Sequence, residues 1–464
     1  MSPLVPLVMW GWLPVVLYLF MRFPAQRAIV ISFVAAWLFL PLAEFKLPGI
    51  PGYTKMSATC YGILLATTVY DVARFSTFKL GWIDLPMLIW CVCPFASSIT
   101  NDLGPYDGFS ATFAQVVTWG VPYFLGRIYL NNLNGLRLLA IGIFVGGLVY
   151  VPLCLYEIRL SPQLNLKIYG FVAGNGDFAQ NVRYGGYRPT VFMEHGLAVG
   201  AWMMAATLCG IWLWHTGVIK KIWNIPVSWL VAVLLITFVL CKSTGAYVLL
   251  AIGLFILFAA KWLRTALPLL ILIVALSSYL YVGMNGTFSG DQVVGGLTQV
   301  GFDQERVGSL KFRLDNEEIL GNKARQSPIF GWGGYGRNRV FDATGKDITI
   351  TDSLWIIAFG VNGAVGLVSL TASLLLPAWS FGAFRYPASL WAGRKVGPAA
   401  VVAVAVTLYM LDCVMNAMIN PIFVLASGAV AGVVMQETGT NQVTSTHSSG
   451  QRRSLPQQRQ RQPN

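Results

Sequence analysis

The sequence predicts a polytopic α-helical membrane protein, and three observations lead to that class. The chain has 464 residues, of which 56% are hydrophobic and only 11% are charged, whereas soluble domains carry about 25% charged residues. Apolar runs of about 17–25 residues recur from Met1 to about Met435, each long enough to cross a bilayer. These runs are continuous, unlike the alternating strands of about ten residues in an outer-membrane barrel. A soluble enzyme, a disordered chain and a fibrous repeat are therefore excluded, and the net charge of +13 gives no reason to expect nucleic acid as a partner.

Thirteen apolar segments are predicted to cross the membrane as helices. The first contains Pro6 and Pro14 and the last is short, so the expected count is about 12–14. The first segment lacks a basic leader and a small-residue cleavage site, so we expect a retained helix rather than a signal peptide. The predicted segments are 3–21, 28–45, 56–72, 84–99, 109–126, 138–157, 191–214, 225–241, 245–260, 266–283, 353–377, 398–415 and 421–435.

These segments divide the chain into six parts. N-terminal helices (1–157) precede a first loop (158–190), central helices (191–283), a long second loop (284–351), C-terminal helices (352–435) and a tail (436–464). The tail is rich in Gln, Ser and Arg and is expected to be disordered. The seven cysteines all lie in or at the ends of apolar segments, so no disulfide framework is predicted.

The basic residues indicate which helix ends face the cytoplasm. Six short connections hold thirteen Lys and Arg residues against two acids, whereas the other short connections hold three of each. Cytoplasmic loops collect Lys and Arg, so the first set and the tail are predicted to be cytoplasmic. Both long loops then lie outside, where their twelve basic residues escape this bias and could bind an anionic ligand. The cytoplasmic set is Arg22, Arg27, Arg74, Lys79, Arg127, Arg137, Lys220, Lys221, Lys261, Arg264, Arg385, Arg394 and Lys395.

The second loop contains a predicted amphipathic helix on the outer surface. From Asp303 to Ala324, apolar residues recur at roughly helical spacing with basic residues between them. Pro328 is expected to end this region, and the glycines of 331–336 permit a tight turn. The apolar positions are Leu310, Leu314, Ile319, Leu320 and Ala324, and the basic ones are Arg306, Lys311, Arg313 and Lys323.

Polar residues gather where the outer loops meet the helices. The first loop ends with Arg183 and Arg188, and Glu194 and His195 follow at the start of the next segment. Lys242, with Ser243 and Thr244, forms a tight outer turn, and Asp352 opens the segment after the second loop. Guanidinium groups bind phosphate oxygens bidentately and can stabilise a diphosphate leaving group. A nearby carboxylate or imidazole can take the proton of an attacking sugar hydroxyl. This arrangement suits group transfer from a lipid-linked diphosphate.

Each of these residues also has a structural explanation. Arg183 and Arg188 could be solvated or bind lipid headgroups, Lys242 could snorkel, and Asp352 could cap a helix. Glu194 and His195 could pair with each other. Asp412, followed by Asn416 and Asn420 on one helix face, is an acid within a membrane segment, for which we slightly prefer a structural hydrogen bond. No aspartate cluster indicates a divalent metal, so no metal or other cofactor is predicted.

The segment from Arg188 to Gly196 (Arg-Pro-Thr-Val-Phe-Met-Glu-His-Gly) resembles the O-antigen ligase and polymerase superfamily of bacterial membrane glycosyltransferases. In that family an outer-loop arginine precedes an aromatic-containing entry to a helix. The family's Ser-Arg-Gly-Ala turn reads Ser243-Thr244-Gly245-Ala246 here, with Lys242 as the neighbouring cation. A long outer loop with a helix near an arginine follows, similar to the region from Arg313 onward, and it closes with a proline and Gly-x-Gly. The resemblance covers roughly 180–370 in motif and the whole chain in layout.

The resemblance implies an inner-membrane GT-C-like transferase that uses an undecaprenyl-diphosphate-linked glycan as donor on the periplasmic side. It implies diphosphate binding by Arg188 and Arg313, with Arg183 and Lys242 close by, and a catalytic base among His195, Glu194 and Asp352, of which we slightly favour His195. Single displacement would invert the anomeric carbon. The acceptor would be a glycan or lipid-linked molecule, with membrane lipids and other polysaccharide-export proteins as candidate partners.

The ligases characteristically have a histidine before Asn where this chain has Thr351-Asp352-Ser353, which favours a polysaccharide polymerase. The alternative within the superfamily is a ligase that transfers finished glycan to a lipid or protein. The alternative of another class is a transporter or lipid flippase, which internal repeats and midplane ions would favour. Asp412 is the main feature in its favour.

Overall fold

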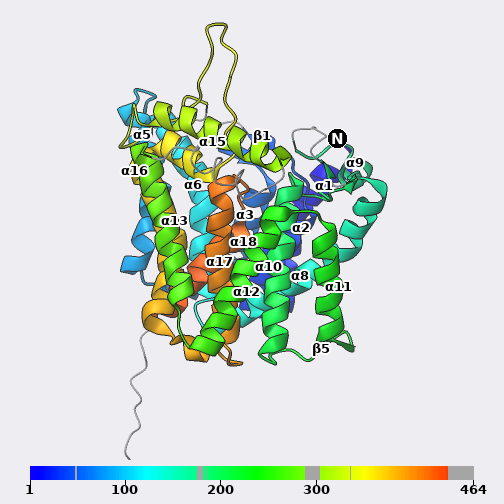
Figure 1. Cartoon of the computed structure of the whole chain (residues 1–464). Coiled ribbons are helices and arrows are strands. Elements are labelled where there is room, and N and C mark those ends of the chain that lie inside the picture. The colour runs from blue at the N-terminus through cyan, green and yellow to red at the C-terminus, as the bar shows by residue number, and fades with distance from the viewer. Residues whose placement is uncertain (48–49, 175–180, 184, 288–303, 335, 437–464) are drawn as a thin grey trace, which may run out of the picture.

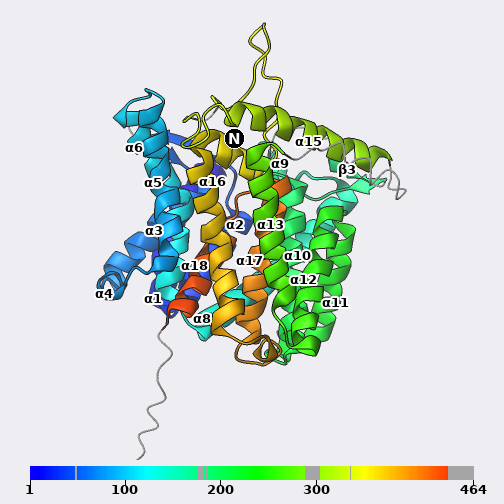
Figure 2. The ribbon, with the colours of Figure 1, turned by 60° about the vertical axis from the view of Figure 1, so that its left-hand side comes forward.

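The computed structural model is a bundle of upright helices with one helix lying across an end (Figures 1 and 2). It describes residues 1–47, 50–174, 181–183, 185–287, 304–334 and 336–436. Each of the thirteen predicted segments coincides with a helix, α6 and α7 being joined through a π-helical turn (Val116–Gly120). The bundle helices are α1 (Leu4–Arg22), α2 (Ala25–Phe39), α3 (Lys55–Tyr70), α5 (Leu85–Thr100), α6 (Pro105–Gln115), α7 (Val121–Tyr129), α8 (Leu133–Leu160), α10 (Gly196–His215), α11 (Val227–Leu240), α12 (Thr244–Leu263), α13 (Leu267–Asn285), α16 (Leu354–Ser380), α17 (Gly397–Met415) and α18 (Pro421–Met435).

Local sequence explains where many of these helices begin. Proline occupies the first turn of α6, α13, α17 and α18, where the backbone N–H it lacks would have no partner within the helix. The side chain of Asn132 caps α8 by accepting the N–H of Gly135 at 2.9 Å, and Thr54 caps α3. The elements outside the bundle are short, apart from α15. They are α4 (Ala73–Thr77), α9 (Leu164–Tyr169), α15 (Gln304–Ala324), the 3-10 turns Trp82–Asp84 and Ala388–Leu390, and the π turn Phe381–Arg385.

Three small antiparallel hairpins accompany the helices and do not change the helical class. They pair β1 (Phe45–Leu47) with β2 (Ile50–Tyr53), β3 (Val182–Arg183) with β4 (Gly186–Tyr187), and β5 (Lys221–Ile222) with β6 (Ile225–Pro226).

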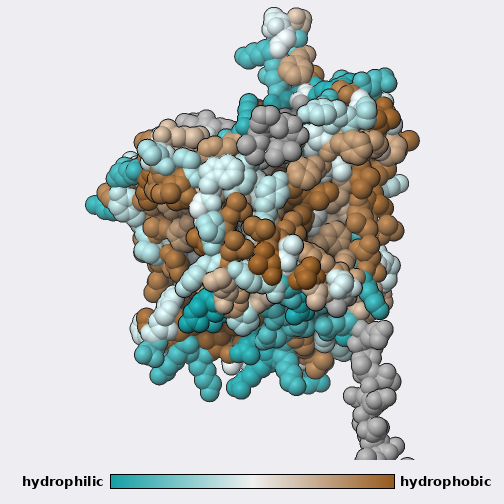
Figure 3. Space-filling view, turned by 180° about the vertical axis from the view of Figure 1, so that it is seen from behind, coloured by the Kyte–Doolittle hydropathy of each residue, from teal (hydrophilic) through white to brown (hydrophobic). Residues whose placement is uncertain are grey.

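Eight helices of the described chain are long and apolar enough to cross a membrane. Helices α2, α11 and α18 are apolar but shorter, so the count of about 12–14 crossings stays a prediction. In Figure 3 apolar residues gather around the middle of the molecule, and hydrophilic residues gather at its two ends. The prediction of a multi-pass helical membrane protein is confirmed. The eight are Leu4–Arg22, Trp82–Thr100, Leu133–Leu160, Gly196–His215, Thr244–Leu263, Leu267–Asn285, Leu354–Arg385 and Gly397–Met415.

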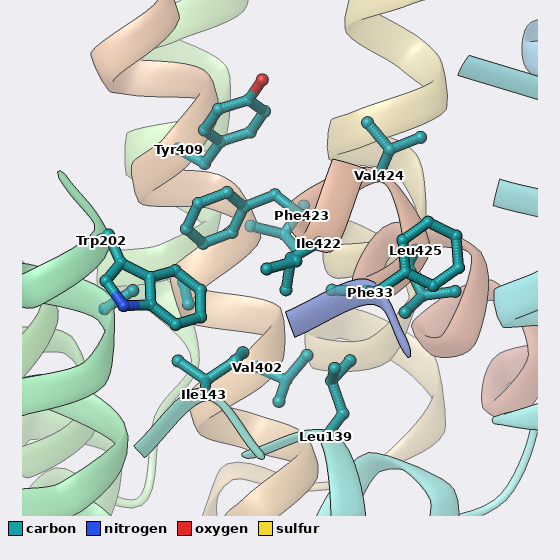
Figure 4. Packing of buried hydrophobic residues seen from close by; sticks show 14 of the residues in the cluster. Phe33, Leu139, Ile143, Trp202, Val402, Tyr409, Ile422, Phe423, Val424 and Leu425 are labelled. Atoms are coloured by element: carbon teal, nitrogen blue, oxygen red, sulfur yellow. The ribbon is translucent and has the colours of Figure 1, made fainter. Parts of the chain in front are cut away.

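The core lies around α10, α17 and α18. Large apolar side chains from five helices meet there, including Phe33, Ile143, Trp202, Val402 and Phe423 (Figure 4). Helices α7 and α18 approach so closely that glycine is required at the contact. A Cβ atom at Gly428 would lie 1.9 Å from the Tyr123 carbonyl oxygen. Small residues allow this kind of backbone contact between membrane helices, where van der Waals packing rather than burial from water drives association.

The two ends of the bundle differ in what covers them. Helix α15 lies across one end, which we call the α15 face, and α18 ends at the other, which we call the tail face (Figures 1 and 2). The six basic connections lie at the tail face, and the described parts of the two long loops lie at the α15 face. The structure thus gathers the charges as the sequence predicts.

Helix α15 confirms the predicted surface helix. Its side chains Leu314, Leu320 and Ala324 are buried, whereas Lys311 and Asp315 are exposed. The prediction that Ile319 belongs to the apolar face is wrong, because that side chain is 39% exposed. The side chains of Arg306 and Leu310 lie outside the described set.

The glycine-rich turn after α15 fills a break in α16. Gly363 has φ +65° and interrupts the helix, and the carbonyl oxygens of Gly360 and Val361 accept the N–H groups of Trp332 and Gly333 at 2.9 and 3.0 Å. In return, the N–H of Ala364 donates to the Pro328 carbonyl oxygen at 2.8 Å. A broken helix survives in a membrane only where other protein groups satisfy its backbone. The predicted turn is confirmed, with positive φ at glycines 331, 333, 334 and 336.

Candidate functional site

Arg188 is buried at the α15 face and joins the two sequence motifs that were predicted to meet. Its side chain is 3% exposed, and Nη2 donates a hydrogen bond to Ser243 Oγ at 3.1 Å. Two glycines of α10 leave room for these groups. A Cβ atom at Gly196 would lie 2.6 Å from Arg188 Cδ, and one at Gly200 would lie 2.5 Å from Ser243 Oγ. The segment after Arg188 and the tight turn at Ser243 therefore form one site.

Glu157, which was not among the predicted site residues, binds the non-helical segment that follows Arg188. Glu157 of α8 is fully buried, and its Oε2 accepts the N–H groups of Thr190 at 2.8 Å and Val191 at 2.7 Å. Its other carboxylate oxygen accepts the N–H of Leu164 at 2.8 Å. These bonds satisfy the N–H groups of a segment that forms no helix and in which Val191 has a positive φ of +52°. Glu157 could have been noticed as an acid near the end of an apolar run, the same signal that marked Glu194.

His195 caps α10, and the positive charges of three arginines act on it. Its Nδ1 accepts the N–H of Leu197 at 3.1 Å, so in the neutral imidazole the proton is on Nε2. Burial and, after it, the positive charges of Arg188, Arg313 and Arg183 lower the pKa of His195 from 6.5 to about 4. The imidazole is therefore neutral at pH 7 and presents an N–H donor to the site.

Arg313 brings α15 to the ends of two bundle helices. Its Nη1 lies 3.2 Å from the Met415 carbonyl oxygen and 3.4 Å from Asn416 Oδ1, just past the end of α17. Its Nε lies 4.0 Å from Asp352 Oδ2, immediately before α16. Both side chains of this ion pair are partly exposed, Arg313 by 27% and Asp352 by 44%. The structure thus brings Arg313 of α15 next to Asp352 and to the end of α17, which lie far from it in the sequence.

Lys242 is tied to the hairpin that carries Arg183. Its Nζ donates to the Arg183 carbonyl oxygen at 3.0 Å, and its backbone has φ +53°. A Cβ atom at Gly186 would lie 2.3 Å from the same Nζ. Lys242 therefore connects the tight turn to the β3–β4 hairpin, and its predicted phosphate contact stays a prediction.

Glu194 faces a different charge from its neighbour His195. Burial raises the pKa of Glu194, and the positive charge of Lys55 opposes that rise. Lys55 is the buried first residue of α3, with Nζ 3.9 Å from the ring centroid of Trp37. Different charges therefore act on Glu194 and His195, as expected because adjacent residues point in different directions.

Asp412 lies beside the arginines, although its sequence position favoured a purely structural bond. Its Oδ1 accepts a hydrogen bond from Asn416 Nδ2 at 2.8 Å, and the Oδ1 of that same amide lies 3.4 Å from Arg313 Nη1. Asn420 instead caps α18, with its Oδ1 accepting the N–H of Ile422 at 3.0 Å. The non-helical residues 416–420 let Asn416 turn toward α15. Sequence distance hid this contact, since α15 precedes Asn416 by about ninety residues.

In the described parts of the chain, no three His, Cys, Asp or Glu side chains come together as a metal site would require. All seven cysteines are buried and unbridged.

These features define a multi-pass helical membrane protein with a cluster of cationic and acidic side chains at one end. Comparison with known proteins finds no matching family model and no matching curated relative.

Proposed function

We propose that this chain is a membrane glycosyltransferase that uses a lipid-diphosphate-linked glycan as donor at the α15 face. The observation that carries the proposal is that the buried Arg188, bound to Ser243, and Arg313, bound at the end of α17, both lie at the α15 face, where their charges and that of Arg183 lower the pKa of His195. Three guanidinium groups in a partly buried site attract a dianionic or trianionic diphosphate and stabilise it as a leaving group. A neutral N–H donor among them adds a hydrogen bond without adding charge.

The proposed donor is undecaprenyl-diphosphate-linked glycan, and the α15 face is proposed to be periplasmic in a bacterial inner membrane. The tail face carries the six basic connections, which favours its cytoplasmic placement. The diphosphate would lie near Arg188 and Arg313, with the lipid tail between helices of a GT-C-like fold. The acceptor hydroxyl would attack from the opposite side of the anomeric carbon and invert it.

The preferred reaction is polymerisation of polysaccharide repeat units, and the alternative is ligation of finished glycan to another acceptor. Asp352, which stands where ligases have a histidine, lies 4.0 Å from Arg313 Nε. A transporter or flippase is less favoured, because Asp412 lies beside the amide that contacts Arg313 at the end of α17.

The test is reconstitution of the purified chain in bilayers that contain undecaprenyl-diphosphate-linked repeat units. We expect free undecaprenyl diphosphate to be released while the glycan on the remaining carrier lengthens. Release that occurs only when a second acceptor is added, without lengthening, would identify a ligase. No release under either condition, with donor movement between leaflets, would contradict the proposal and favour a flippase.

Orientation is tested separately by cysteine labelling of intact spheroplasts with an impermeant reagent. We expect labelling of Lys346→Cys, in an exposed turn at the α15 face, and of a cysteine near Gly295, which lies outside the described residues. Arg394→Cys, exposed at the tail face, should not be labelled. The reverse pattern would overturn the periplasmic placement.

A further inference from the structure

Asp412 and Arg313 are joined through a single neutral amide. Asn416 presents its amide oxygen to Arg313 Nη1 at 3.4 Å and its amide nitrogen to Asp412 Oδ1 at 2.8 Å. Because the oxygen faces a cation and the nitrogen faces a carboxylate, the two contacts fix the orientation of the amide. Asn416 thereby holds Asp412 close to Arg313 without a direct ion pair between the two charged groups.

The other buried or half-buried acids near this end of the described chain are already committed to other groups. Glu157 binds three backbone N–H groups. Glu317 of α15 accepts hydrogen bonds from Tyr279 at 3.1 Å and Trp355 at 3.2 Å. Asp352 pairs with Arg313, and the positive charge of Lys55 acts on Glu194. Asp412 differs because the partner of its Oδ1 is a neutral amide.

Glycosyl transfer places two different demands on the charges around the anomeric carbon. The leaving diphosphate needs cations, whereas the attacking hydroxyl needs a proton acceptor. A carboxylate paired directly with a leaving-group arginine would compete with the phosphate and be a weaker base. The neutral Asn416 amide separates the proton acceptor from the leaving-group arginine while keeping the two adjacent. His195 does not meet the second demand in the neutral tautomer that this bond requires, because its Nδ1 lone pair accepts the Leu197 N–H.

We propose that Asp412 is the proton acceptor of the transfer reaction, with Asn416 as its positioning residue, an inference that rests on the function proposed above. The acceptor oxygen forms a bond to the anomeric carbon as the bond from that carbon to the phosphate oxygen breaks. The electron pair of the broken bond stays on the diphosphate beside Arg188 and Arg313, and the hydroxyl proton passes to the Asp412 carboxylate. Asp352 then orients Arg313, and His195 donates Nε2–H to the donor.

The test compares Asp412→Asn with Asp352→Asn in the reconstituted full chain, with undecaprenyl-diphosphate-linked repeat units as donor. Asp412→Asn keeps the shape of the side chain and removes the basic oxygen. We expect kcat to fall by about 10²–10⁴-fold with little change in the KM for donor, since general-base loss affects turnover rather than binding. Asp352→Asn should raise KM more than it lowers kcat. The matched control is Asp315→Asn, an exposed residue of α15 that pairs with Lys311 and should leave both constants unchanged.

The outcomes separate this inference from the proposed function. Normal kcat in Asp412→Asn, with loss in Asp352→Asn or in His195→Ala, overturns the assignment and leaves the transferase proposal standing. Absence of diphosphate release by the unaltered protein defeats the transferase proposal itself. If Asp412→Asn does not fold, Asn416→Ala decides, because it frees the carboxylate without removing it. A fall of about tenfold or more in kcat at unchanged donor KM supports the inference, and unchanged kcat overturns it.

Discussion

Two ion pairs at opposite ends of the bundle use the same chemical groups in different ways. At the tail face, Arg127 is 6% exposed and forks onto Asp84, with Nε 2.7 Å from Oδ1 and Nη2 2.9 Å from Oδ2. Asp84 is fully buried and also accepts the Tyr123 hydroxyl at 3.1 Å and the Gly81 N–H at 2.9 Å. At the α15 face, Arg313 and Asp352 are 4.0 Å apart and both partly exposed.

The difference shows how to distinguish a structural arginine from a candidate ligand-binding one. The Arg127–Asp84 pair is a closed bidentate contact in which each charge is neutralised within the protein. Arg313 is oriented by the neutral Asn416 amide and the Met415 carbonyl, and its distant carboxylate partner leaves much of its charge available. Burial of an arginine alone therefore does not indicate function; the completeness of its partners does.

Among the three variants that test this comparison, Arg188→Ala is expected to have the largest effect, a loss of transfer. A leaving diphosphate would lose a bidentate partner in a poorly hydrated site, which lowers kcat by about 10²–10³-fold or more. Arg188→Lys should restore little, because a point charge does not replace the planar fork. The measurement is diphosphate release at saturating donor, with folding checked by size-exclusion chromatography. Near-normal product from the lysine variant would show that only charge is needed at this position.

The second prediction concerns stability at the tail face. Arg127→Ala leaves the Asp84 carboxylate buried without its countercharge, which costs about 3–5 kcal/mol of folding free energy. We expect a lower midpoint of thermal unfolding, with the remaining folded protein still active. The control is the double variant Asp84→Asn with Arg127→Met, which removes both charges and should recover much of the stability. A stable but inactive Arg127→Ala protein would contradict the assignment of Arg127 as structural and Arg313 as ligand-binding.

The smallest expected effect is a pH dependence from His195. Its pKa is about 4 when folded and 6.5 ordinarily, so the folded protein binds the proton less readily than the unfolded chain. The stability contribution of neutral His195 is therefore fully present above pH 6.5 and is lost as pH falls toward 4. Wild-type protein should lose more thermal stability between pH 7 and pH 4.5 than His195→Gln does. Equal losses would show that His195 is not desolvated among the arginines.

Local sequence patterns were enough to predict the helical membrane class, the thirteen helical segments, the surface helix α15 and the segregation of charge between the two ends. Length, apolar composition and the placement of Lys and Arg carry that information locally. The sequence also marked Arg188, Arg183, Arg313 and His195, and the charges of the three arginines act on His195 in the structure.

The groups that those residues contact depend instead on how distant helices pack. Three sets of contacts join elements far apart in the chain. The glycine-rich turn fills the break in α16, Glu157 binds the backbone after Arg188, and Asn416 connects Asp412 to Arg313. Periodicity and charge counts report which face or end a residue occupies, but they do not report which distant side chain it meets there. Such pairings depend on how the helices pack, because a hydrogen bond or ion pair forms only where packing brings the two groups within about 3–4 Å of each other.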